Sequence, residues 1–178
     1  MTRAPKRLTR DDWLTAGLSA LRTHGPEALK AEPLARTMGT TKGSFYWHFE
    51  DVPAFHRGLL ELWEKTAQTA LSQAQAGSGT ATSRLRHTAQ TLADQAGADA
   101  AIRAWARGHD GAAETLARVD AARLDCLHAL LSEVGISNPE MARIILASGI
   151  GMAQLGEIHD HDNTGAIGSL VDLVLALR

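Results

Sequence analysis

Side chains suited to binding phosphates and bases are concentrated in one short run, residues 29–49, which reads LKAEPLARTMGTTKGSFYWHF. The second half of this run carries hydroxyls, a cation and aromatic rings with polar edges: Thr40, Thr41, Lys42, Ser44, Tyr46, Trp47 and His48. Hydroxyl and ammonium groups bind phosphate oxygens, and polar side chains can reach base edges in the major groove of a duplex. The run therefore predicts a surface that contacts double-stranded DNA.

Two short helices are expected to position these side chains. A first helix is expected over about 32–38, because Pro33 is tolerated in its first turn and Gly39 can end it. A second helix is expected over about 41–48. Two helices of about seven residues, separated by a tight glycine turn, form a helix-turn-helix. The apolar residues expected to face the core are Leu34, Ala35, Phe45 and Phe49.

The rest of the chain also reads as helix, and no strand-like alternation of apolar and polar residues appears. Thr9 and Asp12 form a capping-box pattern, which opens a helix that runs to about Thr23. The further helices are expected over about 52–75, 83–96, 99–108, 112–134, 139–156 and 164–177. The predicted fold class is all-α, with about nine helices.

The formal net charge of the 178 residues is −2, which taken alone argues against a nucleic-acid partner. That charge is divided unevenly along the chain. Residues 1–65 contain 10 basic and 8 acidic side chains, whereas residues 66–178 contain 8 and 12. Seven of the eight aromatic residues also precede residue 66. The N-terminal third is thus mildly basic and rich in aromatic residues, so the whole-chain charge does not exclude DNA binding.

The run 29–49 resembles the DNA-binding signature of the tetracycline-repressor (TetR) family. That signature is Leu-Ala-x-x-x-Gly, then Ser/Thr-Lys/Arg-Gly-Ser/Thr, then an aromatic residue followed by Tyr-x-His-Phe. Its counterparts here are Leu34-Ala35 with Gly39, Thr41-Lys42-Gly43-Ser44, and Phe45-Tyr46-Trp47-His48-Phe49. The resemblance covers residues 9–65, and the remainder of the chain matches the family only in the number and length of its helices.

The resemblance implies a role for each matching residue. Lys42 is expected to contact a phosphate, and Tyr46 and His48 are expected to contact the DNA backbone. The residues expected to approach the bases are Thr41, Gly43, Ser44 and Trp47. The bare Cα of Gly43 would let the helix sit deep in the groove.

Two positions depart from the family pattern. Lys30 stands where family members usually have a threonine that caps the first short helix, so the cap is weaker but a phosphate-binding cation is gained. Thr40 replaces the usual Val or Ile of the turn, and its hydroxyl needs a partner if it is buried.

The resemblance divides the chain into a helix-turn-helix DNA-binding domain at 1–52 and a helical effector-binding and dimerisation domain at 53–178. The effector pocket is expected between the middle helices, with the candidate residues Trp105, His109, Arg123 and Met152. Trp105 could equally be a plain core residue. Arg123 falls on the apolar stripe of its helix, where it must find a carboxylate such as Asp120 or the acid group of a ligand.

The last two helices are expected to form a homodimer. One reading module would bind weakly, whereas two modules on a two-fold axis read two half-sites of a duplex. The helix at 139–156 carries a heptad-like seam, which favours pairing with a second copy. The expected interface residues are Met141, Ile145, Ser148, Met152, Leu155, Ile167, Leu170, Val171 and Val174. The alternative is that this stripe packs only within the chain.

Other kinds of site receive less support. Residues 159–162 (His-Asp-His-Asp) offer metal-type ligands, but no cysteine or distant histidine is positioned to complete a site, so no metal and no cofactor are expected. The single cysteine, Cys126, cannot form an internal disulfide, which fits a reducing compartment. The start of the sequence has no secretory signal and no stretch is apolar enough to span a membrane, so a cytoplasmic protein is expected.

Three functions are compatible with these patterns. The leading one is a dimeric transcriptional regulator, expected to be a repressor that binds a palindromic operator and is released by a small-molecule effector. A ligand-independent architectural DNA-binding protein would have a featureless C-terminal half. A helical enzyme would need His159 or His161 as catalytic groups, yet the sequence offers no nucleophile–base pair and no phosphate-binding glycine loop. An enzyme is therefore not expected.

Overall fold

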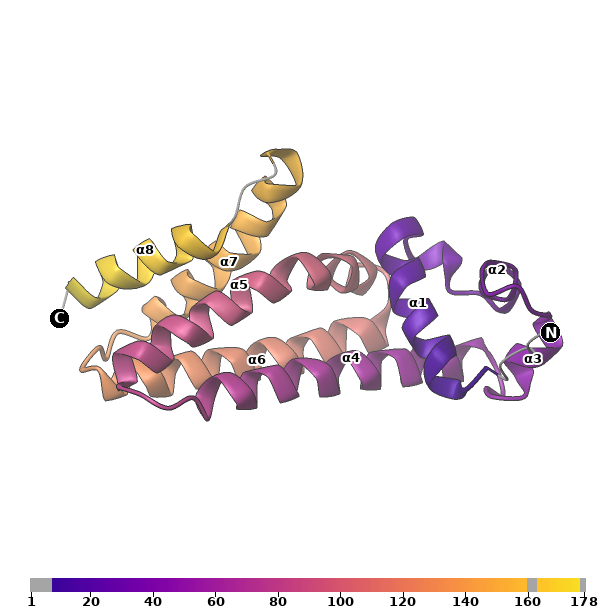
Figure 1. Ribbon diagram of the computed structural model, residues 1–178, viewed down its shortest axis with the longest axis horizontal. Helices are drawn as coiled ribbons and strands as arrows, with labels where there is room; N and C mark the ends of the chain where they lie inside the picture. Colours follow the sequence, from indigo (N-terminus) through magenta and orange to yellow (C-terminus); the bar gives the residue numbers. More distant parts are fainter. Residues whose placement is uncertain (1–7, 160–162, 177–178) are drawn as a thin grey trace, which may run out of the picture. The chain divides into compact units, whose positions relative to one another are not determined.

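Every regular element in the computed structural model, which describes residues 8–159 and 163–176, is helical (Figure 1). The elements are α1 (Arg10–His24), the 3₁₀ helix η1 (Pro26–Ala28), α2 (Ala31–Thr37), α3 (Lys42–Tyr46), α4 (Val52–Gln75), α5 (Ala81–Ala106), α6 (Asp110–Glu133), α7 (Glu140–His159) and α8 (Asn163–Ala176). The predicted all-α fold is confirmed.

The chain divides into two compact units inside α4. The N-terminal unit ends at Trp63 and the C-terminal unit begins at Glu64. This boundary is defined by packing. The predicted boundary between residues 52 and 53 divides the chain by expected function, and it stays a prediction.

The prediction of separate helices at 83–96 and 99–108 is wrong, because α5 is continuous through both ranges. Gly97 weakens a helix by about 1 kcal/mol relative to alanine. Two residues later, however, the carboxylate of Asp99 is buried and lies 2.6 Å from the guanidinium of Arg123 in α6. This ion pair needs Asp99 in helical register, so tertiary packing overrides the local break. The chain accordingly has eight α-helices in its described residues rather than about nine.

An aromatic cluster forms the core of the N-terminal unit. The ring of Phe45 lies 5.4 Å from that of Trp13, 5.1 Å from that of Phe49 and 5.3 Å from that of Phe55, measured between centroids. A Cβ on Gly17 of α1 would lie only 2.5 Å from Cζ of Phe55 at the start of α4. The two helices therefore pack so closely that a larger residue at this position would clash. The predicted capping box at the start of α1 is confirmed, and Leu34 and Ala35 are buried as predicted.

In the C-terminal unit, α5 is the central helix and packs against α6, α7 and α8. The backbones of α5 and α7 lie close together at Gly149 of α7, where a Cβ would lie 3.5 Å from Cα of Ala93. Exposed ion pairs add to this packing: Arg84 pairs with Glu133 of α6, and Arg86 pairs with Asp172 of α8. The apolar core of the unit includes Leu85, Leu127, Leu131, Ile145, Ile167 and Val171.

A buried charge network crosses from α5 to α6 within this core. The guanidinium of Arg123 is only 3% exposed and lies 2.6 Å from Asp99 and 3.4 Å from Asp120. The carboxylate of Asp120 also accepts two hydrogen bonds from Arg103, at 2.7 and 2.8 Å. Two guanidinium groups and two carboxylates thus cancel in charge. The prediction that Arg123 would need a carboxylate is confirmed, with Asp99 as the closer partner and Asp120 as the farther one.

A second ion pair holds the C-terminal part of α4 to α6. Arg118 donates to both carboxylate oxygens of Glu64, at 2.9 and 2.8 Å, and also to the hydroxyl of Thr115. These hydrogen bonds from Arg118 hold the pKa of the Glu64 carboxyl below its usual range. The fork lies at the first residue of the C-terminal unit, so it fixes α4 to α6 where the helix enters that unit.

Removing the cation of the buried network should be strongly destabilising. Arg123→Met should lower the free energy of unfolding by about 3–5 kcal/mol, because the carboxylate of Asp99 would stay buried without its counter-charge. Urea denaturation followed by circular dichroism measures this loss. The double variant Arg123→Met/Asp99→Leu should recover most of it, since no orphaned charge remains. Equal stability of the single and double variants would contradict this account.

The contribution of the Glu64–Arg118 pair should depend on pH. Because the folded-state pKa of Glu64 is depressed, its stabilisation is fully present above the unfolded-state pKa and disappears as pH falls through the folded-state value. A double-mutant cycle of Glu64→Gln and Arg118→Gln should give a coupling energy of about 0.2–1 kcal/mol at neutral pH. The coupling should begin to shrink as the pH falls below the ordinary pKa of a glutamate, about 4.3, and should vanish once the pH lies below the folded-state value. A coupling that does not change with pH would rule out the ionised pair as its source.

Candidate functional site

A tight turn separates α2 from α3. Gly39 has a φ of +65°, in the left-handed region that favours glycine. The amide of Thr40 donates to the carbonyl of Ala35 at 2.9 Å, which closes the end of α2. The predicted helix-turn-helix is therefore present. Its second helix spans Lys42–Tyr46 and is shorter than the predicted 41–48, because Trp47 and His48 lie in the turn that follows.

The two short helices begin differently. The hydroxyl of Thr41 accepts from the amide of Ser44 at 3.3 Å and so caps α3. Lys30 precedes α2 without a capping side-chain hydrogen bond, as the sequence indicated. Its ammonium group instead pairs with Glu27 at 2.7 Å, where both side chains are largely exposed. Lys30 is thus held by a weak surface contact that a phosphate could replace.

The second helix and the residues after it have one buried and one exposed side. Phe45 and Phe49 are buried in the aromatic cluster, whereas Tyr46 is 46% exposed and Trp47 is 84% exposed. An indole with this exposure contributes little to the core, so its apolar surface is available to a partner. Among the other predicted contact residues, the exposed ones are Thr41, Lys42 and Gly43, and the half-buried ones are Thr40, Ser44 and His48.

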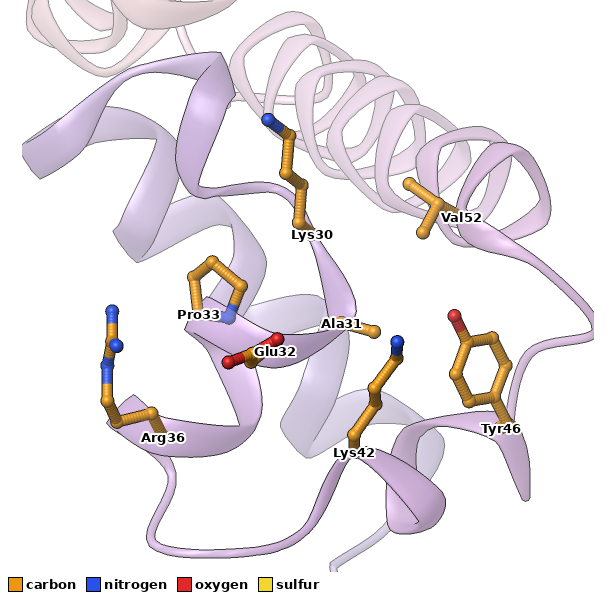
Figure 2. Close-up of a pocket in the computed structure, with 8 residues that line it drawn as sticks. All are labelled: Lys30, Ala31, Glu32, Pro33, Arg36, Lys42, Tyr46 and Val52. Atoms are coloured by element: carbon orange, nitrogen blue, oxygen red, sulfur yellow. The ribbon is translucent and has the colours of Figure 1, made fainter.

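A groove of about 410 Å³ lies beside this exposed side (Figure 2). It is lined by Lys30, Ala31, Glu32, Pro33, Arg36, Lys42, Tyr46 and Val52. Figure 2 shows Lys42 and Tyr46 extending from one side, and the ammonium of Lys42 lies 6.0 Å from the centre of the Tyr46 ring. Three cations and a phenol share the groove with one carboxylate, which gives it a net positive charge suited to phosphate.

Arg36 is a member of this groove that the sequence pattern did not single out. It lies on the exposed side of α2, in the last turn of that helix. The family signature has most of its expected DNA contacts on the second helix, and Arg36 lies on the first. The available signal was the position of Arg36 three residues after Pro33, which places both on one side of α2.

The four residues predicted for the effector pocket have three different kinds of surroundings. Trp105 is 5% exposed, and its ring centroid lies 4.5 Å from that of His109. The Nδ1 of His109 accepts from the amide of Ala112 and caps α6. Arg123 belongs to the buried charge network, and Met152 is half-buried on α7. The charge of Arg123 is already matched by carboxylates, and a ligand role for these residues stays a prediction.

Four of the predicted interface residues lie in the core of the single chain: Ile145, Ile167, Val171 and Val174. They belong to the same apolar core cluster as residues of α5 and α6, so they contribute little surface to the single chain, and their place in a dimer interface stays a prediction. The predicted residue Leu155 is exposed, at 54%. Two apolar residues outside the predicted set are exposed as well, Ile144 at 42% and Leu173 at 61%. Of the two large apolar side chains exposed on the described part of α7, Leu155 belongs to the predicted seam and Ile144 does not. The predicted residues Met141, Ser148, Met152 and Leu170 are half-buried.

The metal-type ligands at residues 159–162 lie at the edge of the described part of the chain. Asp160, His161 and Asp162 lie outside the described residues, and so does the side chain of His159. In the part of the chain that is described, no three His, Cys, Asp or Glu side chains converge to hold a metal ion. Among the same residues, no helix is long and apolar enough to cross a membrane.

Comparison with known proteins shows similarity of structure without close similarity of sequence. No protein-family model and no curated protein matches the sequence. A transcriptional regulator from Rhodococcus sp. Rha1 matches with a TM-score of 0.75 and 18% identity, over 96% of this chain and 95% of its own.

Two further solved structures show the same similarity. A TetR-family transcriptional regulator from Streptomyces coelicolor matches with a TM-score of 0.76 and 17% identity, over 94% and 88% of the two chains. The fatty acid degradation regulator FadR from Bacillus halodurans matches with a TM-score of 0.71 and 16% identity, over 98% and 97%. The likeness extends over both units, so the chain has the fold of TetR-family transcriptional regulators.

Proposed function

We propose that this protein is a DNA-binding transcriptional regulator, acting as a repressor on a palindromic operator, and not an enzyme. The observation that carries the proposal is the exposed side of α3, where Lys42 and Tyr46 project from a helix anchored by a buried phenylalanine and the exposed Trp47 follows directly. A short polar helix on a rigid core, in a helix-turn-helix, is suited to lie in a major groove. The fold it shares with TetR-family regulators supports the same function.

Phosphate binding and base reading would fall to different residues. Lys30, Arg36 and Lys42 surround one groove and would neutralise phosphates, which supplies most of the affinity and makes it depend on salt. Trp47 directly follows the C-terminal end of α3, and its exposed indole can contact base edges or thymine methyl groups. Thr41, Gly43 and Ser44 would lie between these two regions and approach the bases.

Dimerisation would place two reading units on one operator. Ile144 and Leu155 are eleven residues apart, which is about three turns, so they lie on one side of α7. Gly151 lies between them with open space around its Cα, and Leu173 is exposed on α8. We assign these residues to the homodimer interface, because apolar side chains exposed in the protomer would be covered there.

DNA binding can be tested with duplexes taken from the region upstream of the protein's own gene. Fluorescence anisotropy at several salt concentrations should show tighter binding to one palindromic duplex than to a scrambled duplex. Lys42→Ala should weaken binding to both and reduce the salt dependence by about one unit per protomer. Trp47→Ala should mainly reduce the preference for the operator, by about 1–3 kcal/mol.

A matched control is Arg107→Ala, which removes an exposed cation from the C-terminal unit. It should leave both affinity and salt dependence unchanged. Wild-type protein that binds no duplex preferentially, or a Lys42→Ala variant that behaves like Arg107→Ala, would overturn the DNA-binding proposal.

The proposed interface can be tested by sedimentation velocity. Wild-type protein should sediment as a dimer, and Leu155→Glu should sediment as a monomer because it introduces charges at an apolar contact. Ala129→Glu places the same side chain at an exposed position of α6 and should leave the dimer intact. Circular dichroism checks that both variants remain folded. A Leu155→Glu variant that stays dimeric would exclude this stripe as the interface.

A further inference from the structure

One cation of the groove beside α3 is already paired within the chain. The ammonium of Lys30 lies 2.7 Å from a carboxylate oxygen of Glu27, which belongs to the 3₁₀ helix η1. Among the described residues, the other two cations of the groove, Arg36 and Lys42, form no ion pair with a carboxylate. Figure 2 shows Lys30 extending away from both of them. Lys30 is therefore the cation of the groove whose charge is committed to another contact.

The backbone between the two residues of this pair is held in place. The amide of Leu29 donates to the carbonyl of Pro26 at 3.0 Å, which closes η1. The side chain of Leu29 is completely buried, and its carbonyl oxygen lies 3.0 Å from Nε2 of His56 in α4. Glu27 and Lys30 are thus displayed from a short segment that is anchored between them, so the backbone keeps the carboxylate within reach of the ammonium.

The two charged side chains, in contrast, are not fixed by packing. The Lys30 side chain is 62% exposed and the Glu27 side chain is 86% exposed. The hydrogen bond and the charge of Lys30 hold the pKa of the Glu27 carboxyl below its usual range, so the pair is ionised at neutral pH. An exposed pair of this kind stabilises a protein only slightly, so an anionic partner can separate it. Movement of the Lys30 side chain alone is sufficient for the exchange.

The pair changes what Lys30 can contribute to a phosphate contact. While the pair is closed, the carboxylate of Glu27 cancels the charge of Lys30, and the groove attracts a phosphate mainly through Arg36 and Lys42. When the pair opens, Lys30 gains a phosphate, but Glu27 is left unpaired beside the duplex. The free energy of separating the pair is therefore subtracted from the free energy of the phosphate contact.

We propose that Glu27 is an internal competitor of DNA: its carboxylate occupies Lys30, and a DNA phosphate must displace it before Lys30 contributes to binding. This inference rests on the DNA-binding function proposed above, and it assigns Glu27 the role of lowering the affinity for every duplex. Binding to random DNA depends on phosphate contacts alone, whereas binding to an operator also uses base contacts. A uniform penalty on phosphate contacts therefore leaves the base contacts to decide which duplex is occupied.

The competition can be tested by removing the carboxylate. In fluorescence anisotropy at one salt concentration, Glu27→Gln should bind both the operator and the scrambled duplex more tightly, by about two- to fivefold per protomer, because Lys30 no longer has a partner to leave. The matched control is Glu133→Gln, which removes the carboxylate of the pair with Arg84 in the C-terminal unit. It should leave both affinities unchanged. A Glu27→Gln variant that binds as the wild type does would overturn the proposal.

A double-mutant cycle separates the loss of the pair from the loss of a negative charge. Lys30→Ala should weaken DNA binding less in the wild-type background than in the Glu27→Gln background, because only the second background gives Lys30 its full phosphate contact. Glu32 is the comparison, since its carboxylate lines the groove and pairs with no cation among the described residues. Glu32→Gln should tighten binding equally with and without Lys30. An equal effect of Lys30→Ala with and without Glu27 would overturn the proposal.

The contact itself is measured on the full chain without DNA. Carbon-detected NMR should give the Glu27 carboxyl a pKa below about 4.3, the ordinary value of a glutamate, and Lys30→Met should return the pKa to that value. An ordinary pKa of Glu27 in the wild type would overturn the proposal. Wild-type protein that binds no DNA would overturn the proposed function and this inference together. Additive effects of the two substitutions, in a protein that does bind its operator, would overturn this inference alone.

Discussion

The packing of Phe45 into the aromatic cluster is the interaction on which the exposed side of α3 depends. A helix of five residues has too few hydrogen bonds to be stable alone, since helix nucleation is unfavourable. Three neighbouring rings, from Trp13, Phe49 and Phe55, bury Phe45 completely and fix the orientation of α3. The exposed positions before and after Phe45 must then point outward. The side chains proposed to contact DNA are thereby held in place by a core that makes no such contact itself.

The C-terminal unit is ordered by a different kind of constraint. Its central helix α5 places Asp99 against Arg123, and another register of α5 on α6 would leave these buried charges unpaired. A buried ion pair adds little net stability compared with apolar packing, but breaking it is costly. This network therefore specifies one arrangement of the helices. The Glu64–Arg118 fork, in which the Arg118 side chain is more than half exposed, is a weaker contact.

Charge is distributed according to these roles. The groove beside α3 gathers three cations around a single carboxylate, although the N-terminal third is only mildly basic. Residues 66–178, by contrast, contain 8 basic and 12 acidic side chains. The net charge of the whole chain cannot show the cationic groove, because acidic side chains elsewhere in the sequence offset it.

The sequence by itself determined the helical fold, the helix-turn-helix and the division of α3 into inward and outward residues. These features depend on local rules of capping, glycine conformation and apolar spacing, which act over a few residues. Tertiary structure alone decided that α5 is continuous, that Arg36 joins Lys30 and Lys42 in one groove, and that Ile145 is core whereas Ile144 is surface. Each of these depends on contacts between residues far apart in the chain. A shift of one residue rotates a side chain by about 100° around a helix, and only the neighbouring helices select which side is buried.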